Sequence, residues 1–413
     1  MKPEDLFFTK AMDEDEYIIA RYYVESPLGL KRGAEEIGKE ESTGTWTSVP
    51  RERRIHKLYA ARIIKLDYKN SISDIGFPIE NFSWDVGGIP QLMSTIAGNL
   101  FGLEKLKNVR LLDVHLPKSV VREFKGPRLG VEGLRKIIGT EINRRAHVGT
   151  IIKPKIGLPP KEQAEVFYEA ASGGIDCGKD DETLSNQRFS PLLERAQAIR
   201  EVVDKVKSET GRRVLYAINV TNRCDKLLET VDSAAENGAT LLMIDAVCVG
   251  LNGIQAIAEA NNHLPLLVHR AGHAAFDRNP RHGINNMVIA KLSRLCGGDL
   301  IHTGAIGKMH GEVLEIRAYN DFLRREWFHI RKSMPVASGG LHPGLVEKNI
   351  KLLGSDLQLQ AGGGIHSHPK GTRAGAAAMR QAVEAVNHRI PLNEYAKTHS
   401  ELKAALKKWG YVR

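Results

Sequence analysis

Short runs of β-branched and other apolar residues recur along the second part of the chain. Each run is followed by a polar cluster and then by a longer stretch with helical spacing, eight times between about residues 148 and 389. The predicted strands are Val148–Lys155, Ile175–Glu182, Arg213–Val220, Thr240–Val247, Leu264–Gly272, Leu300–Gly304, Met334–Gly340 and Leu357–Gly364. Strands that alternate with helices are typical of parallel βαβ units, and eight units over roughly 240 residues predict a closed (β/α)8 TIM barrel.

The first 125 or so residues have a different pattern. Tyr17–Val24 and Lys57–Asp67 alternate between apolar and polar positions, as half-buried antiparallel strands do. Leu28–Glu41 and Ile89–Leu100 have helical spacing instead. The expected fold of this part is therefore an α+β (ferredoxin-like) sandwich.

Three parts of the chain are predicted from these patterns. Residues 1–127 form the α+β domain, residues 128–390 form the catalytic barrel, and residues 391–413 form a helical tail. The connector is expected near Pro127–Asn143, and an amphipathic helix is expected at residues 392–409. At 413 residues the chain is long enough for two domains with a large core.

Barrels of this kind place their chemistry at the C-terminal ends of the strands. In chain order, the predicted strands end in Lys153 and Lys155, then Lys179, Asp181 and Glu182, then Asn219, Asp245, His269 with Arg270 and His273, His302, Ser338-Gly339-Gly340 and Gly362-Gly363-Gly364. A single polar residue at a strand end is often only a cap or a turn residue. So many together predict an active site, and glycine turns after the last two strands are typical of a phosphate site.

The segment Lys179-Asp180-Asp181-Glu182 follows the short apolar strand Gly174–Gly178. Hard cations such as Mg²⁺ take oxygen ligands. A lysine becomes an oxygen ligand only after its neutral amine has captured CO₂ as a carbamate, and the pKa of an active-site lysine shifts readily. In isolation such a segment is usually a solvated acidic turn, but the surrounding strand ends favour a metal site.

Eight motifs occur in an order that is specific as a set. They are Glu40–Thr47 (EESTGTWT), Ala97–Gly102 (AGNLFG), Gly149–Leu158 (GTIIKPKIGL), Gly173–Glu182 (GGIDCGKDDE), His269–His273 (HRAGH), His302–Glu312 (HTGAIGKMHGE), Ser338–Gly340 (SGG) and Gly362–Pro369 (GGGIHSHP). Together they resemble the large subunit of the RuBisCO superfamily over nearly the whole chain. The segment Ile390–Val412 is most similar to archaeal members.

The resemblance implies a metal centre and its acid–base groups. Lys179 would be carbamylated and would hold Mg²⁺ together with Asp181 and Glu182, so that the metal acts as a Lewis acid on the bound sugar. Lys153 would handle protons near the enediolate, Lys155 would support the site, and His269 would be a second acid–base group. Without this context, a histidine in the apolar run before Arg270 would more often be a satisfied buried group.

The resemblance also implies how a sugar bisphosphate is held. One phosphate would be bound by Arg270, His302 and Ser338, and the other by Gly340, Gly362, Gly363, Thr45 and Trp46. The substrate-binding set further includes His273, Gly339, Glu40 and Asn99. Lys308 would lie on a mobile loop that closes over the substrate. For Trp46, the alternative is a core aromatic.

In the resembled family, the small domain covers the barrel mouth of a partner chain. Glu40, Thr45, Trp46 and Asn99 would therefore complete the active site of the neighbouring chain. A homodimer, or an assembly of dimers with shared active sites, is expected.

The implied reaction is Mg²⁺-dependent enolisation of ribulose 1,5-bisphosphate, followed by CO₂ addition and cleavage to 3-phosphoglycerate. The alternative is a RuBisCO-like protein that enolises or isomerises another phosphorylated ketose without CO₂ fixation. Every position that can be matched holds the residue that carboxylation needs. However, the stretch from His302 to Lys308 is short, and a shortened lid can misplace Lys308. Thr183, Gly272 and His366-Ser367 also depart from the carboxylases.

The net charge of +10, from 59 basic and 49 acidic residues, makes a nucleic-acid-binding protein a remote alternative. Basic and acidic residues are mixed along helical stretches, and no basic run carries interleaved aromatics, so no nucleic-acid partner is expected. The four cysteines lack metal spacing, which favours a reducing cytoplasm over a disulfide framework. Neither a secretory signal nor a long apolar span appears, so a cytoplasmic enzyme without a membrane contact is expected.

Overall fold

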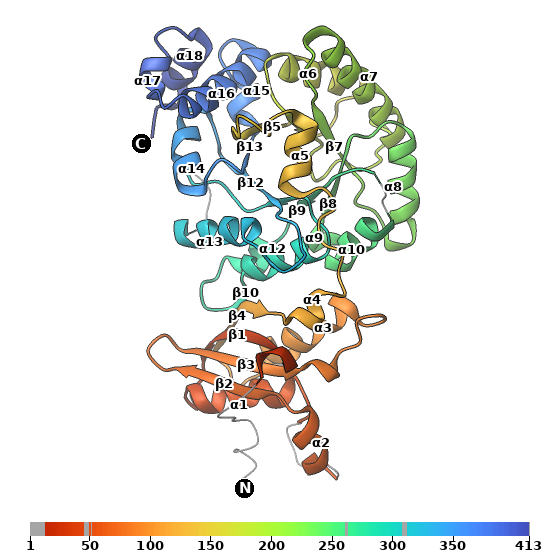
Figure 1. Ribbon diagram of the computed structural model, residues 1–413, viewed down its shortest axis with the longest axis vertical. Helices are drawn as coiled ribbons and strands as arrows, with labels where there is room; N and C mark the ends of the chain where they lie inside the picture. Colours follow the sequence, from red (N-terminus) through yellow and green to blue (C-terminus); the bar gives the residue numbers. More distant parts are fainter. Residues whose placement is uncertain (1–12, 45–48, 51, 261–262, 308–311, 413) are drawn as a thin grey trace. The chain divides into compact units, whose positions relative to one another are not determined.

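Figure 1 shows the computed structural model, which describes residues 13–44, 49–50, 52–260, 263–307 and 312–412. The chain divides into two compact units. The first, called the N-terminal unit below, contains the described residues up to Lys125 together with Gly272–Leu292. The second, the barrel unit, contains Gly126–Ala271 and the described residues from Ser293 onward.

Eight parallel strands close the barrel, in the order β11-β12-β13-β5-β6-β7-β8-β9 with β9 paired to β11. They are β5 (His147–Ile151), β6 (Cys177–Lys179), β7 (Leu215–Asn219), β8 (Leu241–Asp245), β9 (Leu266–His269), β11 (Leu300–His302), β12 (Met334–Ser338) and β13 (Gln358–Ala361). Each predicted strand overlaps one of these, so the predicted (β/α)8 barrel is confirmed. Strands β7 and β8 are nearly continuous apolar runs because both of their faces are buried.

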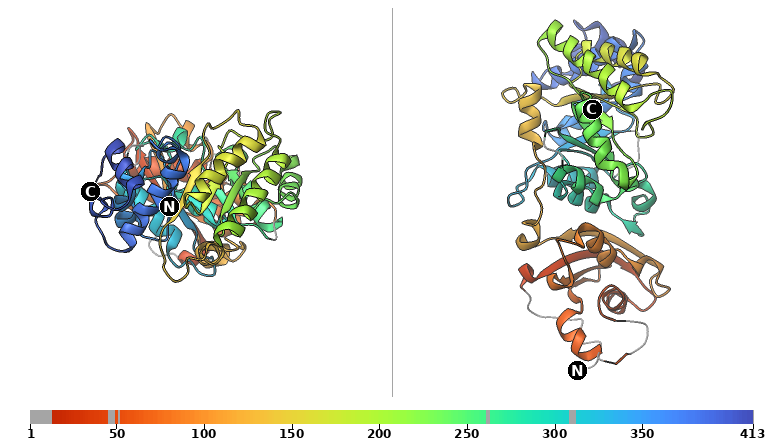
Figure 2. Two further views of the ribbon diagram at one scale, coloured as in Figure 1. Left: turned by 90° about the horizontal axis from the view of Figure 1, so that it is seen from above. Right: turned by 90° about the vertical axis from the view of Figure 1, so that its right-hand side faces the viewer.

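Helices follow the strands of the barrel. They are α6 (Pro160–Ser172), α7 (Leu192–Thr210), α8 (Leu227–Glu236), α9 (Ala246–Val249), α10 (Leu251–Ala260), α11 (Ala274–Asp277), α12 (Asn286–Leu295), α13 (Val313–Arg324), α14 (Val346–Leu353), α15 (Gly363–His366) and α16 (Gly371–Asn387). Short 3₁₀ turns, η5 (Cys224–Lys226) and η6 (Pro343–Leu345), precede α8 and α14. Figure 2 shows α6 and α7, in yellow and light green, on the outside of the barrel.

The region expected to be a connector contains a helix, α5 (Gly130–Ile138). Its Val131 and Leu134 pack in one buried cluster with residues near the starts of the strands, among them Leu215, Leu241 and Met334. The helix therefore fills the N-terminal end of the barrel with apolar side chains. The opposite end, where the strands finish, remains available for chemistry.

The N-terminal unit contains a mixed sheet with the order β10-β4-β1-β3-β2. Its strands are β1 (Tyr17–Glu25), β2 (Arg62–Asp67), β3 (Ile72–Pro78), β4 (Asn108–His115) and β10 (Gly283–Ile284). Its helices are α1 (Leu30–Glu40), α2 (Glu52–Tyr59), α3 (Gly88–Ile96) and α4 (Lys118–Val121), with 3₁₀ turns η2 (Glu14–Glu16), η3 (Ile79–Asn81) and η4 (Asn99–Gly102). Strands β4, β1, β3 and β2 are antiparallel neighbours, which confirms the predicted ferredoxin-like domain.

Two predicted elements of this unit are wrong at their ends. Residues 57–59 belong to α2 rather than to a strand, and their side chains are exposed, so the alternation there does not reflect burial. The helix predicted over Ile89–Leu100 ends at Ile96. It stops because the Glu41 carboxylate accepts the N–H groups of Gly98 and Leu100, at 3.2 and 2.6 Å, which a continuing helix would direct along its own axis.

Residues 272–292 belong to the N-terminal unit, although the strand pattern placed them within the barrel. Strand β10 adds in parallel to β4, and the Asp277 carboxylate accepts a hydrogen bond of 2.7 Å from Arg110. Lys291 donates to the side chain of Asp113 and to the carbonyl of Val114. Strand β10 has only two residues, which is too short for an alternation of apolar and polar positions. The sequence pattern therefore did not indicate its pairing with β4.

The C-terminal tail forms two helices, α17 (Leu392–Tyr395) and α18 (Ser400–Trp409), and not the single helix predicted at residues 392–409. The break occurs at His399, which has an extended backbone and stacks on Tyr395 with ring centroids 3.9 Å apart. Within the described residues, no helix combines the length and the apolar content needed to cross a membrane.

Candidate active site

The segment after β6 brings three of the predicted site residues together. Lys179 is the last residue of β6, is fully buried, and has its Nζ 3.8 Å from Glu182 Oε2. Asp181 Oδ2 accepts a hydrogen bond of 3.0 Å from Lys153 Nζ, which comes from the loop after β5. Asp181 Oδ1 accepts another of 2.8 Å from the Thr183 hydroxyl. The cluster at the ends of β5 and β6 therefore contains two lysines, each close to one carboxylate.

Asp180 points away from this cluster. Its Oδ1 accepts hydrogen bonds of 2.8 Å from Gln163 and from the Tyr216 hydroxyl, and its Oδ2 accepts 3.1 Å from Arg195 Nε and 2.9 Å from the backbone of Asn219. Successive residues of an extended chain face opposite sides. Asp180 is therefore fixed against α6, α7 and β7, and only two of the three consecutive acidic residues belong to the candidate site.

Burial changes the acid–base behaviour of the cluster. Burial lowers the pKa of Lys179 below its usual value, although Glu182 and Asp181 oppose the shift. Burial alone would raise the pKa of Asp181, but hydrogen bonds from Lys153 and Thr183 outweigh it and the net pKa is lowered. The neutral amine of Lys179 is therefore easier to form than that of an exposed lysine, while Asp181 remains ionised.

A histidine and a carboxylate meet across two neighbouring strands. Asp245 and His269 are paired in the register of β8 and β9, and His269 Nδ1 lies 2.6 Å from Asp245 Oδ1. His269 Nε2 lies 3.7 Å from Glu182 Oε2, and the ring of His302 contacts that of His269 with centroids 4.5 Å apart. Asp245 was predicted to lie at a strand end but was assigned no role, although its position at the end of β8 is a usable signal.

The glycine turn after β13 lies beside Lys153. A Cβ added at Gly362 would be 3.2 Å from Lys153 Cε, whereas a Cβ added at Gly363 would meet no heavy atom within 4 Å. The turn therefore presents its backbone to open space next to the lysine that contacts Asp181. That is the geometry in which backbone N–H groups can receive an anion.

The loops after β9, β11 and β12 also lie close together. A Cβ added at Gly304 would be 2.8 Å from Arg270 Nη2, and Ala305 N donates to the carbonyl of Ser338 at 2.9 Å. Gly339 and Gly340 follow with φ of 113° and 66°, a backbone conformation that favours glycine. Arg270 is therefore beside the loop that follows His302.

In the N-terminal unit, Glu40 and Asn99 are in contact. Asn99 Nδ2 donates to Glu40 Oε1 at 3.3 Å. The neighbouring Glu41 is buried, and its carboxylate accepts the N–H groups on either side of Asn99. Burial raises the pKa of Glu41 to about 7. Glu41 was not singled out in the sequence, and its long-range contacts leave no local signal.

The remaining predicted residues either lie outside the described part of the chain or belong to other segments of it. Thr45, Trp46 and Lys308 lie outside the described residues. His273 belongs to the segment that joins the N-terminal unit, and Lys155 is exposed in the loop after β5. In the part of the chain that the structure describes, no three His, Cys, Asp or Glu side chains form a complete metal site, so a third ligand would have to come from Lys179.

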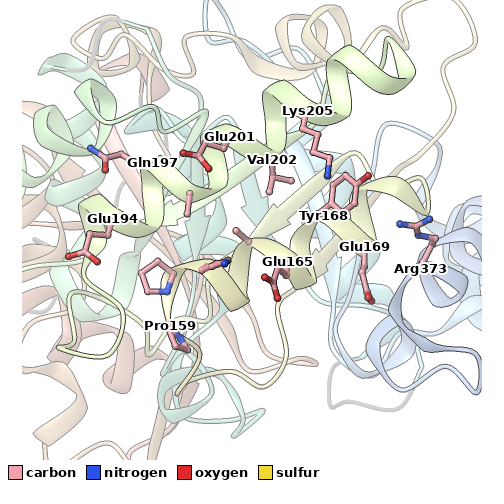
Figure 3. Close-up of a pocket in the computed structure, with 14 residues that line it drawn as sticks. Pro159, Glu165, Tyr168, Glu169, Glu194, Gln197, Glu201, Val202, Lys205 and Arg373 are labelled. Carbon is pink, nitrogen blue, oxygen red and sulfur yellow. The ribbon is translucent and has the colours of Figure 1, made fainter.

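A separate pocket of about 820 Å³ lies on the outer side of the barrel, between α6 and α7 (Figure 3). It is lined by the glutamates Glu165, Glu169, Glu194 and Glu201, by Tyr168 and Lys205, by further residues of the two helices, by Pro159 before α6 and by Arg373 of α16. None of the predicted site residues lines it. It is therefore distinct from the candidate active site at the strand ends.

The comparisons with known proteins agree with this arrangement. The family models for the ribulose bisphosphate carboxylase large chain match residues 7–120 (N-terminal domain) and 130–409 (catalytic domain). The chain is 44% identical over 416 residues to a ribulose bisphosphate carboxylase of Pyrococcus furiosus, which covers 99% of this chain and 97% of the relative. A ribulose bisphosphate carboxylase of Methanocaldococcus jannaschii is 39% identical over 403 residues, covering 92% and 94%.

Solved structures give the same result. The octameric ribulose-1,5-bisphosphate carboxylase/oxygenase of Pyrococcus horikoshii superposes with a TM-score of 0.92 at 40% identity, covering 99% of both chains. The dimeric archaeal Rubisco of Hyperthermus butylicus superposes with a TM-score of 0.89 at 35% identity, covering 99% of this chain and 100% of that one. The chain therefore belongs to the ribulose bisphosphate carboxylase (RuBisCO) large-chain family.

Proposed function

We propose that this protein is a ribulose-bisphosphate carboxylase, which enolises ribulose 1,5-bisphosphate, adds CO₂ and cleaves the product to 3-phosphoglycerate. The observation that carries this proposal is the convergence of Lys179, Asp181 and Glu182 with Lys153 at the ends of β5 and β6. Archaeal relatives named ribulose bisphosphate carboxylase match over nearly the whole chain, at 37–44% identity.

The charges of this cluster support a metal site with a modified lysine. As ammonium groups, Lys153 and Lys179 balance the two carboxylates, Asp181 and Glu182. Addition of CO₂ to Lys179 forms a carbamate, and the ammonium form loses two protons in the process. The four groups then carry a net charge of −2, which suits a divalent cation with oxygen ligands. The lowered pKa of Lys179 favours this addition, because only the neutral amine attacks CO₂. We therefore assign Mg²⁺ to the Lys179 carbamate, Asp181 and Glu182.

When bound, Mg²⁺ would polarise the ketone and hydroxyl oxygens of the sugar. The Lys179 carbamate would accept the C3 proton in the enolisation. Lys153, held against Asp181, would exchange protons with the oxygens of the enediolate, and Lys155 would support the site. The Asp245 carboxylate, 2.6 Å from His269 Nδ1, favours the tautomer with the proton on Nδ1, which leaves Nε2 as a second acid–base atom.

The strand ends also supply two candidate phosphate sites. Arg270, His302 and Ser338 would bind one phosphate through charge-assisted and neutral hydrogen bonds. The glycine turns, Gly339-Gly340 and Gly362-Gly363, would bind the other through backbone N–H groups. Lys308 would be delivered by its loop to the carboxylate that forms from CO₂.

We further propose dimers with shared active sites. The two solved relatives are described as octameric and dimeric, which supports an assembly of this kind. Glu40, Asn99, Thr45 and Trp46 would then serve the site of the neighbouring subunit. The four cysteines are free thiols, which supports the expectation of a reducing cytoplasmic compartment.

The test is direct. The purified protein is incubated with CO₂, Mg²⁺ and ribulose 1,5-bisphosphate, and both 3-phosphoglycerate and the exchange of the C3 proton with solvent are measured. The proposal requires both signals, and product formation should depend on CO₂ and on Mg²⁺. Exchange without 3-phosphoglycerate would instead identify a RuBisCO-like enolase or isomerase. Neither signal with any ketose phosphate would refute the enolising mechanism.

A further inference from the structure

We infer that the C-terminal helix α18 braces the two glycine turns after β12 and β13, and that Trp409 is a positioning residue for phosphate affinity. The inference rests on the proposed function, because it takes these turns to bind phosphate. No part of the reaction described above uses α18.

The two turns are packed directly on each other. A Cβ added at Gly364 would lie 2.2 Å from the carbonyl oxygen of Leu341 and 2.8 Å from His342 Cα. Only a residue without a side chain fits there, so the backbones of the two loops touch. A shift of one turn therefore moves the other.

The indole of Trp409 contacts one histidine from each loop. Its ring stacks on His342 with centroids 5.8 Å apart and an interplanar angle of 23°, and lies 6.2 Å from the ring of His368 at 49°. His342 follows Gly340 by two residues, and His368 follows Gly364 by four. Both histidines are buried, with 3% and 4% of their surface exposed. Trp409 thus contacts both loops a few residues beyond the glycines.

Hydrogen bonds attach the rest of the tail to the same two loops. Val412 N donates to Gly344 O at 3.1 Å, and a Cβ added at Gly344 would be 1.9 Å from Gly410 O. On the other loop, His368 Nε2 bonds to the carbonyl of Glu401 at 3.0 Å. Lys408 Nζ donates to the carbonyl of Ser367. Residues that follow Trp409 therefore contact the loop after β12, and residues that precede it in α18 bond to the loop after β13.

Recognition of an anion by backbone N–H groups depends on their positions to within about 0.5 Å. Loss of the indole removes the contact that the two loops share, so the turns loosen and phosphate affinity falls. Lys179 is the last residue of β6, and Lys153 and Asp181 lie in the loops that follow β5 and β6, whereas the contacts of α18 described above are with the loops after β12 and β13. We therefore expect a change in KM and not in kcat.

The experiment compares Trp409→Ala and Trp409→Phe with the control Lys403→Ala, which changes an exposed position of the same helix. The KM for ribulose 1,5-bisphosphate, kcat, and the dissociation constant of inorganic phosphate are measured for each full-length variant. Trp409→Ala should raise KM and the phosphate constant about fivefold or more with kcat within about twofold, as for loss of two aromatic contacts. Trp409→Phe should give a smaller change, and Lys403→Ala none.

Unchanged KM and phosphate affinity in Trp409→Ala, or a fall in kcat alone, would overturn the inference. If Trp409→Ala does not fold, Trp409→Phe decides by the same criteria. Phosphate binding requires no turnover, so the two proposals can fail separately. If the wild-type protein makes no 3-phosphoglycerate, the carboxylase proposal is refuted. If the Trp409→Ala variant nevertheless binds phosphate more weakly than the wild type does, the brace is supported. A wild-type protein that does not bind phosphate would refute the brace.

Discussion

Replacement of Asp180 by asparagine should destabilise the barrel unit strongly, although Asp180 takes no part in the proposed chemistry. The Asp180 and Arg195 side chains are both fully buried, and Asp180 accepts four hydrogen bonds. Asparagine keeps one acceptor oxygen and turns an NH₂ group toward donors. It also leaves the Arg195 charge uncompensated, and removal of one partner of a buried ion pair costs about 3–5 kcal/mol. At about 2–4 °C per kcal/mol, Tm should fall by roughly 6–20 °C.

The assay is thermal and urea denaturation followed by circular dichroism, without Mg²⁺ and CO₂ so that metal binding adds nothing. Asp204→Asn is the matched control, because Asp204 pairs with Arg200 on the same helix, α7, but both side chains are about half exposed. That change should alter stability by less than about 1 kcal/mol. The double variant Asp180→Asn with Arg195→Met should recover part of the loss, because it removes the unpaired charge. If Asp180→Asn costs no more than Asp204→Asn, the assignment of Asp180 to the scaffold is wrong.

Three further predictions address the site and its surroundings. Lys179→Ala should abolish 3-phosphoglycerate formation and CO₂-dependent Mg²⁺ binding together, measured by product assay and calorimetry; activity with unaltered Mg²⁺ dependence would show that the ligand is misassigned. Lys308→Ala should lower carboxylated product about 10²-fold while exchange of the C3 proton with solvent stays measurable by NMR; an equal loss of both would contradict a separate role in CO₂ addition. The pKa of Glu41, about 7 in the folded chain against 4.5 as the ordinary value, implies stability that is full below pH 4.5 and is lost as pH rises through 7. Denaturation between pH 5 and 8 should show this fall in wild type and a flatter profile in Glu41→Gln.

The sequence predicted the barrel well because most of its strands contain β-branched or other apolar residues and are followed by polar residues or glycines and then by a helical pattern. It placed the ends of those strands too late, since Lys153, Asp181 and Glu182 belong to loops and not to strands. Convergence of the site residues follows from parallel strands that end at the same side of a barrel. These positions could therefore be predicted without any knowledge of contacts.

Other features depend on contacts between residues far apart in the chain. The partner of Asp180 is fifteen residues away on another element, and Glu41 bonds to the backbone of Leu100, fifty-nine residues away. Neither contact produces a local pattern. The break at His399 was also missed, because apolar spacing continues across it while the backbone does not. Patterns of apolar and polar residues predict helices and strands, whereas the hydrogen-bond partners of buried polar side chains become known only from the structure.

The membership of residues 272–292 in the N-terminal unit has a consequence for synthesis. A chain that has been translated only to Lys125 has all four antiparallel strands of this sheet, but lacks β10 and the partners of Arg110 and Asp113. From residue 125 to residue 292 the ribosome must add 167 residues, which takes roughly 10–30 s at typical translation rates. During that interval the outer edge of β4 has no strand beside it, and an open edge can pair with another chain. The nascent protein is therefore most exposed to misassembly before residues 293–413 are made, and its N-terminal unit finishes folding only when more than half of the described barrel unit has been synthesised.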